Sequence, residues 1–412
     1  MWSQTVQADS PVVAIRAGRV LDPADATLST NQVLLVEEGR ITAIGPGLTI
    51  PQNARVVDLS TQTVLPGLMD AHTHLCLSVD AKWDLGSFWI VAIQRTPGFR
   101  AIQGAAHARE MLESGFTTVR DMGNAGNYLD MDLEKAIRFG IVPGPTIIPA
   151  GRIIAPFGGQ FWENPADKET IQNPEYTAAD TKDEMIRAVR QNIYFGAKVI
   201  KIVVDGQRYC YSTEDIRQIV KEAGGAGLKV AAHVQTVRGA RAAIEAGVAS
   251  IEHGWELTDQ DLALAKQKHV VLVSTDFPAR VLRACGVDEK DAESTHHRFV
   301  ERLRRAYAAG VSIVFGTDII VDIPGETRGS LAIEYVDSFV EAGVPAAEIL
   351  RAMTTRAAVL LGVDDERGRI CKGMAADLIA VPGNPLLDIH QLRNIVFVMK
   401  EGRIVRTADN RQ

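Results

Sequence analysis

Apolar and polar positions alternate in two different ways along the chain. In the middle, short apolar runs typical of strands are separated by longer amphipathic runs typical of helices, such as TKDEMIRAVRQNIYFG and STEDIRQIVKEAG. We count eight strand-like runs, among them TVLPGLMDAHTH, AKVIKIVVDG, LKVAAHVQT and SIVFGTD. Eight repeated strand–helix units are the pattern of a (β/α)8 barrel. We therefore predict an α/β protein with a TIM barrel over residues 63–365.

The two ends of the chain have a different pattern. Short β-branched runs are interrupted there by Gly, Pro and Asp, as in QVLLVEEGRITAIGPG near the start and NIVFVMKEGRIVR near the end. Two β-rich ends around a different middle predict one small sheet domain, assembled from residues 1–62 and 366–412.

Composition narrows the classes of partner. The 412 residues carry a formal net charge of −7, which does not favour nucleic-acid binding. The chain lacks an apolar run of the ~18 residues needed to cross a bilayer, so we expect no membrane partner. The start lacks a signal-peptide pattern, so we expect a cytoplasmic protein, or an exported one if a leader has been removed. Exposed helices around a barrel commonly build symmetric assemblies, so we expect a homo-oligomer.

Six polar residues fall at the same end of the predicted barrel strands. They are His72 and His74 on the first strand, Lys201 on the fourth, His233 on the fifth, His253 on the sixth and Asp318 on the eighth. Each alone has an ordinary interpretation, as a structural histidine, a buried ion-pair partner or a turn cap. Together, at the catalytic end of five strands, they predict one site.

The residue types in this set favour two metal ions. Imidazole and carboxylate ligands suit a divalent cation such as zinc. An ammonium group would repel a cation, but Lys201 lies among apolar residues that favour the neutral amine. Reaction of that amine with carbon dioxide would give a carbamate able to bridge two metals, which would share a hydroxide and activate it.

These motifs resemble those of the amidohydrolase superfamily. The similarity runs through LPGLMDAHTHL, FTTVRDMG, KVIKIVVDG, VAAHVQT, SIEHGWE, IVFGTD and CKGMAADLIAV, which span almost the whole chain. It is strongest to the imidazolonepropionase-like branch, which includes Xaa-Pro dipeptidases, carboxypeptidase-like dipeptidases and ochratoxin-type amidases. The resemblance implies that the two terminal segments form a composite β-sandwich beside the barrel.

The resemblance also implies a role for each residue of the site. His72, His74 and Asp318 would bind the first metal, and His233 and His253 would bind the second. Carboxylated Lys201 would bridge them, and Asp318 would act as general base and then as proton donor. Imidazolonepropionases usually use one metal and lack the bridging lysine, so Lys201 argues against that activity.

Substrate contacts are less well defined by the sequence. The candidates are Tyr211 and Arg208 after the fourth strand, Gln160 in the long third loop and Ile320 in an apolar loop after the eighth strand. Tyr211 would bind a substrate carboxylate or would be an ordinary aromatic residue. We expect hydrolysis of N-acyl (aromatic) amino acids or dipeptides with a hydrophobic C-terminal residue, ochratoxin-like amides included. The alternatives are a prolidase, a cyclic amide or imide hydrolase with the same metals, and a non-catalytic scaffold.

Overall fold

The computed structural model describes residues 12–80, 83, 90–91, 94–123, 127–159, 176–206 and 208–407. The two ends of the chain share one seven-stranded sheet with the order β17-β16-β15-β4-β1-β2-β3. Its strands are β1 (Val13–Asp22), β2 (Thr27–Glu37), β3 (Arg40–Pro46), β4 (Arg55–Pro66), β15 (Leu378–Val381), β16 (Phe397–Lys400) and β17 (Arg403–Arg406). Strand β4 joins the two ends, because it pairs with β1 on one side and β15 on the other.

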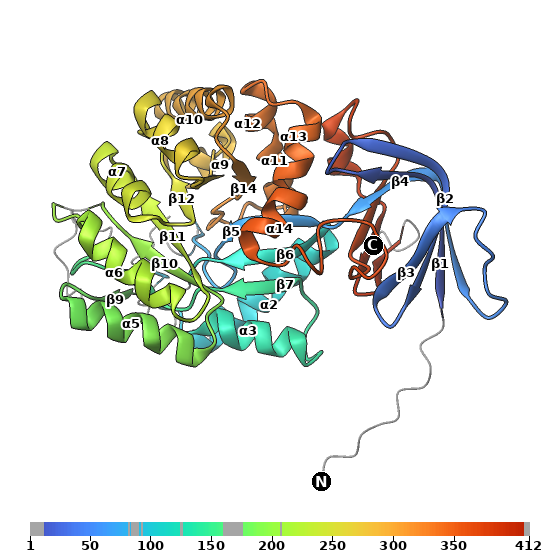
Figure 1. Ribbon diagram of the computed structural model, residues 1–412, viewed down its shortest axis with the longest axis horizontal. Coiled ribbons are helices and arrows are strands. Elements are labelled where there is room, and N and C mark those ends of the chain that lie inside the picture. Colours follow the sequence, from blue (N-terminus) through green and yellow to red (C-terminus); the bar gives the residue numbers. More distant parts are fainter. Residues whose placement is uncertain are drawn as a thin grey trace, which may run out of the picture.

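This terminal sheet has its own apolar core. Alternate residues of its strands are buried on one side, as Ile15, Leu34, Val64, Leu378 and Phe397 show. Figure 1 shows the sheet at one end of the molecule, with blue and red strands side by side. The predicted boundary at residue 62 falls within β4, and the division into domains stays a prediction.

The middle of the chain forms two parallel sheets. One has the order β5-β6-β7 and the other the order β14-β13-β12-β11-β10-β8-β9. Their strands are β5 (Leu68–Thr73), β6 (Phe116–Asp121), β7 (Thr146–Pro149), β8 (Ile153–Ala155), β9 (Tyr176–Ala178), β10 (Val199–Val203), β11 (Lys229–Val234), β12 (Ser250–His253), β13 (Val271–Ser274) and β14 (Ile313–Phe315). The sequence PTIIPAGRII is divided between β7 and β8.

Backbone hydrogen bonds connect the two parallel sheets in two places. The Asp318 amide, just after β14, donates to the His72 carbonyl of β5 at 2.8 Å. The second bond joins β7, the outer strand of the smaller sheet, to the segment before β10, an inner strand of the larger one: the Lys198 amide donates to the Pro149 carbonyl at 2.8 Å. The ends of strands that are far apart in sequence are therefore held next to one another.

Helices follow most of these strands and lie on the outside of the parallel sheets (Figure 1). They are α2 (Pro97–Glu113), α3 (Leu129–Arg138), α5 (Lys182–Phe195), α6 (Thr213–Gly224), α7 (Val237–Ala246), α8 (Asp259–Gln267), α9 (Ala279–Ala284), α10 (Glu289–Ala309), α11 (Arg328–Glu334), α12 (Val336–Glu341), α13 (Ala346–Ala352) and α14 (Thr355–Leu361), with a 3-10 helix η1 (Ile389–Asn394).

Helix α6 shows how the local sequence sets such an element. Ser212 caps its N-terminus and Asp215 completes a capping box, which satisfies backbone amides that have no partner inside the helix. Ile216, Ile219 and Ala223 lie on one face and are buried. Each buried isoleucine contributes about 1.5–3 kcal/mol.

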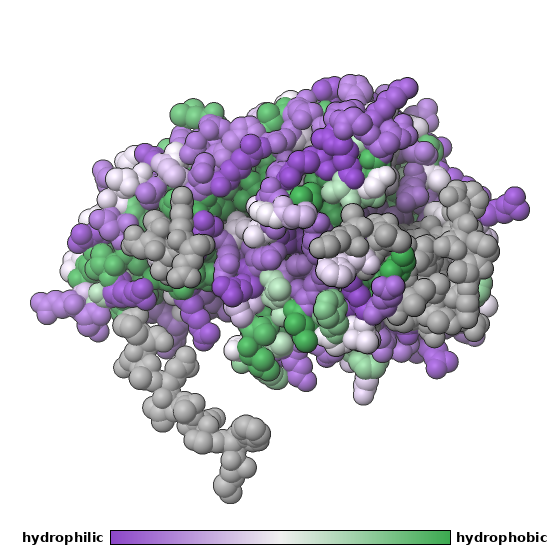
Figure 2. All heavy atoms as spheres, turned by 180° about the vertical axis from the view of Figure 1, so that it is seen from behind, coloured by the Kyte–Doolittle hydropathy of each residue, from purple (hydrophilic) through white to green (hydrophobic). Residues whose placement is uncertain are grey.

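The outer surface is mainly polar. Figure 2 shows one face on which hydrophilic residues predominate and apolar residues form small, separate groups. None of the helices in the described part of the chain combines the length and apolar character that crossing a bilayer requires.

Candidate metal centre

The structure brings the six predicted residues together at the ends of the parallel strands. Asp318 lies among three of the imidazoles. Its Oδ1 is 3.1 Å from His74 Nε2 and 3.6 Å from His72 Nε2, and its Oδ2 is 3.8 Å from His253 Nδ1. Ligand atoms of His72, His253 and Asp318 all lie within 4.8 Å of one another, which is close enough to hold one cation.

Lys201 and His233 complete the group. Lys201 Nζ lies 3.4 Å from His72 Nε2, and only 2% of the lysine is exposed. The ring of His233 lies 4.5 Å from the ring of His253. His233 Nε2 is buried without a hydrogen-bond partner among the described residues, as expected of a nitrogen that binds a metal ion. The residues present therefore fit a divalent metal.

Unusual backbone conformations position two of these residues. His253 has a φ of 69° and Asp318 a φ of 57°, in the left-handed region that side chains with a Cβ rarely adopt. Such strain is maintained only where the surrounding structure enforces it, and it is concentrated at functional sites. In both cases the turn occurs where the strand ends.

The electrostatic environment favours the protonation states that bind metal. Burial lowers the pKa of His72 to about 4 and that of His233 to about 3, so both imidazoles are neutral at pH 7. Burial would raise the pKa of Asp318, but the adjacent His72 and His74 outweigh it and hold that pKa at about 2. Neutral imidazoles beside an ionised carboxylate are a cation-binding set.

Hydrogen bonds at the second ring nitrogen orient three of the imidazoles. His72 Nδ1 lies 2.7 Å from Glu252 Oε2, and His253 Nδ1 lies 2.7 Å from Thr275 Oγ1. His74 Nδ1 lies 2.5 Å from the Gly123 carbonyl. For His72 and His74 this leaves Nε2 facing Asp318. Partners of this kind fix the tautomer of a metal-binding histidine.

The sequence reasoning missed Glu252 and Arg120. Arg120 NH2 lies 2.7 Å from the other oxygen of Glu252, and both residues are buried. The signal was available, because FTTVRDMG and SIEHGWE each contain a charged residue inside a strand that is otherwise apolar or weakly polar. Charges of opposite sign in two parallel strands suggest a buried pair.

The carboxylates of Asp70 and Asp121 accept hydrogen bonds from backbone amides next to the metal ligands. Asp70 accepts hydrogen bonds from the amides of His72 and Thr317 at 2.9 and 3.1 Å, which ties β5 to the segment before Asp318. Asp121, the last residue of β6, accepts a hydrogen bond from the Leu75 amide at 2.8 Å. It thus holds the backbone that follows His74.

The loops after β5 and β14 are also joined. The Val79 amide donates to the Ile320 carbonyl at 2.6 Å. Asp322 Oδ1 lies 3.2 Å from Arg328 NH2 and 3.3 Å from His107 Nε2. Because Arg328 also donates to the Ile319 carbonyl, this cluster fixes the residues directly after Asp318.

The residues predicted to contact the substrate differ in how deeply they are buried. The Tyr211 hydroxyl is buried and donates to the Ala179 carbonyl at 2.6 Å, whereas Arg208 is exposed. Ile320 is partly buried and packs against the main apolar core. Gln160 lies outside the described residues. The structure does not bring the three described residues together at the metal ligands, and their roles stay predictions.

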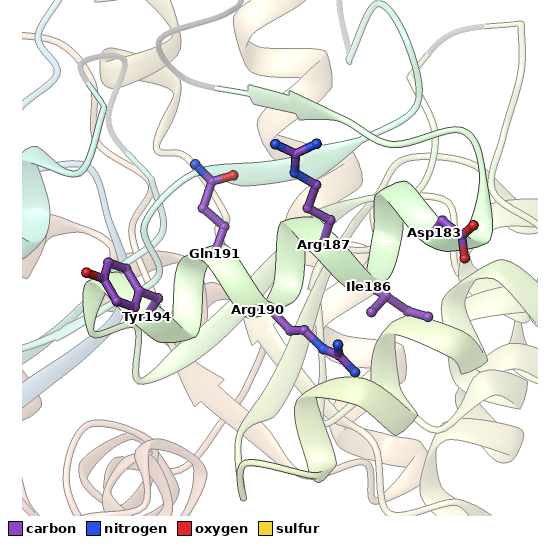
Figure 3. Close-up of a pocket in the computed structure, with 6 residues that line it drawn as sticks. All are labelled: Asp183, Ile186, Arg187, Arg190, Gln191 and Tyr194. Atoms are coloured by element: carbon purple, nitrogen blue, oxygen red, sulfur yellow. The ribbon is translucent and has the colours of Figure 1, made fainter.

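A separate hollow lies along the outer face of α5. Figure 3 shows the side chains that line it, which are Asp183, Ile186, Arg187, Arg190, Gln191 and Tyr194. It contains none of the six metal-site residues. One of the lining residues, Arg190, pairs with Glu222 of α6 at 2.6 Å.

A parallel α/β fold with buried imidazoles and a carboxylate at its strand ends is typical of metal-dependent hydrolases. The amidohydrolase family model matches residues 63–407, so the chain belongs to the amidohydrolase family. The family generally uses divalent metals, and the protein is a metal-dependent hydrolase that acts on amide bonds.

Three similar proteins of known activity are consistent with this assignment to the amidohydrolase family. An ochratoxinase from Aspergillus niger is 28% identical, over 97% of this chain and 87% of that protein. An imidazolonepropionase from Porphyromonas gingivalis is 25% identical, over 90% and 86%. The crystal structure of a Xaa-Pro dipeptidase with bound methionine superposes with a TM-score of 0.84 at 30% identity and covers 95% of this chain and 99% of the dipeptidase.

Proposed function

We propose that the protein is a binuclear metal-dependent amidohydrolase that cleaves N-acyl (aromatic) amino acids or dipeptides with a hydrophobic C-terminal residue. The observation that supports this most is the position of Asp318, within 3.1–3.8 Å of three imidazole nitrogens. Lys201 Nζ lies 3.4 Å from His72 Nε2, the nitrogen that also faces Asp318. Two ligand groups around one lysine suit two cations better than one.

We assign the ligands in two groups. His72, His74 and Asp318 would hold the first ion, and His233 and His253 the second. Carboxylated at Nζ, Lys201 would supply two oxygens to bridge them. Burial of Lys201 between apolar strands favours the neutral amine, which is the form that reacts with carbon dioxide. Zinc is the ion that this imidazole-rich set favours.

A side chain of the protein would then transfer the proton during the reaction. When bound, two divalent ions lower the pKa of a water molecule and polarise the amide carbonyl. Asp318 Oδ1 faces the centre of the site, where it would accept the proton of the attacking water and pass it to the departing nitrogen. Its low pKa keeps it ionised and ready to accept at neutral pH. Neighbouring His74 would hold the carboxylate in place.

Two relatives support the substrate class. Ochratoxinase is matched over almost the full length of this chain. The Xaa-Pro dipeptidase, which is similar over 95% of the chain, favours prolidase activity as the second candidate. Both names are consistent with a small amide or dipeptide as substrate.

We also infer that the two parallel sheets close into a (β/α)8 barrel over residues 63–365. The backbone hydrogen bonds Asp318–His72 and Lys198–Pro149, which connect the two sheets, support closure. Residues 1–62 and 366–412 would then form the composite β-sandwich, which the shared terminal sheet supports.

A kinetic panel tests the proposal. Zinc-loaded enzyme is assayed on N-benzoyl-phenylalanine, N-benzoyl-proline, a matched Xaa-Pro dipeptide and a cyclic imide. We expect the highest kcat/KM on the N-acyl-phenylalanine. A preference of tenfold or more for the Xaa-Pro dipeptide would make the protein a prolidase instead, and activity on the imide alone would refute both.

A further inference from the structure

We propose that Arg120 and Glu252 form a charged pair that orients His72 and strengthens it as a metal ligand. Both would be positioning residues, acting through the imidazole rather than on the substrate. The inference rests on the proposed metal centre. It adds the group that determines how tightly the His72 position holds its ion.

The pair reaches His72 through a continuous set of buried contacts. Glu252 Oε2 accepts from His72 Nδ1 at 2.7 Å, and Glu252 Oε1 accepts from Arg120 NH2 at 2.7 Å. Glu252 is completely buried and Arg120 is 2% exposed. With Nδ1 acting as donor, the lone pair of His72 lies on Nε2, which faces Asp318 and Lys201.

Arg120 is fixed to the strand that carries His72. Its Nε donates to the carbonyl of Ala71, the residue directly before His72, at 2.6 Å. Ser250 Oγ donates to Glu252 Oε1 at 2.5 Å and accepts from Arg120 NH1 at 3.3 Å. The Glu252 carboxylate thus receives hydrogen bonds on both oxygens. These bonds connect strands β5, β6 and β12 and fix the position of the carboxylate relative to His72.

A carboxylate as the hydrogen-bond acceptor at Nδ1 distinguishes His72 from its neighbours. His74 Nδ1 bonds to a backbone carbonyl, and the hydrogen-bond partner of His253 Nδ1 is a threonine hydroxyl at 2.7 Å, with the Asp318 carboxylate farther away at 3.8 Å. A carboxylate draws the Nδ1 proton more strongly and leaves Nε2 more electron-rich. A buried carboxylate requires a counter-charge, which Arg120 supplies. If the ion pair served stability alone, Glu252 would not need to accept a hydrogen bond from His72.

The experiment measures zinc affinity of the full-length protein. Wild type, Glu252→Gln, Arg120→Met, Arg120→Lys and the double variant Arg120→Met/Glu252→Gln are titrated with Zn2+ against a competing chelator in bicarbonate buffer. Asp377→Asn is the matched control, because it removes a buried carboxylate from an ion pair with Arg367 in the segment that links to the terminal sheet. Cobalt-substituted samples add the absorption spectrum of the metal.

We expect Glu252→Gln and Arg120→Met to weaken zinc binding at one of two positions by about 10- to 100-fold. Arg120→Lys should recover part of that loss, and the double variant should be no weaker than the worse single variant, because the two act as one unit. The cobalt spectrum should change in Glu252→Gln and stay as in wild type in Asp377→Asn.

Two results would overturn the inference: wild-type zinc affinity in Glu252→Gln, or an equal loss in Asp377→Asn. If Glu252→Gln fails to fold, Arg120→Lys and Arg120→Met still decide the question. If wild type itself binds no zinc, the proposed metal centre is wrong, which is a different failure from that of the Arg120–Glu252 pair.

Discussion

Gly316 lies against His72 with no room for a side chain between them. A Cβ at Gly316 would stand 2.9 Å from His72 Cβ and 2.5 Å from Val273 Cγ1. The glycine therefore allows the end of β14 to approach β5, so that Asp318, two residues later, reaches the imidazoles.

Gly316→Ala should destabilise the fold and weaken metal binding together. Overpacking of this kind costs about 1–3 kcal/mol, and it would push apart the two strand ends that hold His72 and Asp318. Urea unfolding and zinc titration measure both effects. Gly224→Ala is the control, since a Cβ there meets nothing within 4 Å in helix α6 and should leave stability unchanged or slightly raised. Full zinc affinity in Gly316→Ala would contradict this explanation.

Asp318→Asn should remove most of the catalytic rate. The amide cannot take up a proton, so kcat should fall by about 10²–10⁴-fold, the range for loss of a positioned acid–base group. Steady-state kinetics on the preferred substrate provide the measurement, with metal content determined on the same samples. If Asp318→Asn retained more than a tenth of wild-type kcat, another group would have to move the proton.

Arg328→Met should loosen the segment after Asp318. Arg328 is 5% exposed and binds Asp322 and the Ile319 carbonyl, so its loss takes a buried donor from that carbonyl and one of several partners from Asp322. We expect kcat to fall about tenfold while zinc content stays near that of wild type. Loss of zinc in proportion to loss of rate would instead assign Arg328 to the integrity of the metal site.

Glu401 should stabilise the terminal sheet in a pH-dependent way. Burial would raise its pKa, but Lys400 and Arg367 hold it at about 2, below the ordinary 4.5. A depressed carboxyl pKa stabilises the folded state above pH ~4.5, and the effect disappears as pH falls toward 2. Because half of the side chain is exposed, Glu401→Gln should cost only about 1 kcal/mol at pH 7.

Urea unfolding of wild type and Glu401→Gln at pH 7 and pH 3 checks this sign. The difference between the two proteins should shrink at the lower pH. A gap that stays constant or widens on acidification would mean that Glu401 acts through packing rather than through its charge.

Much of the site was predictable from strand ends alone. The alternation of residues in LMDAHTH puts His72 and His74 on one face, and the position of Lys201 inside an apolar run indicated an unusual role. The fold class followed from the repeated strand–helix pattern, which agrees with the parallel sheets and the family match.

Other features depend on contacts that sequence spacing does not record. Arg120 and Glu252 are 132 residues apart, so only the folded strands reveal that they meet. The hydrogen bond from the Tyr211 hydroxyl to the Ala179 carbonyl could not be read from the sequence either, and the role of Tyr211 as a carboxylate contact stays a prediction. The split of PTIIPAGRII between two sheets likewise depends on the partners of each half.

The number of metal ions per chain tests the central claim most directly. Wild type and Lys201→Ala are reconstituted with zinc in bicarbonate buffer, freed of loosely bound ions and analysed by elemental analysis. The proposed bridge predicts two zinc ions per wild-type chain, at most one in Lys201→Ala, and loss of activity with the second ion. One ion or fewer in wild type, or two ions and full activity in Lys201→Ala, would contradict it.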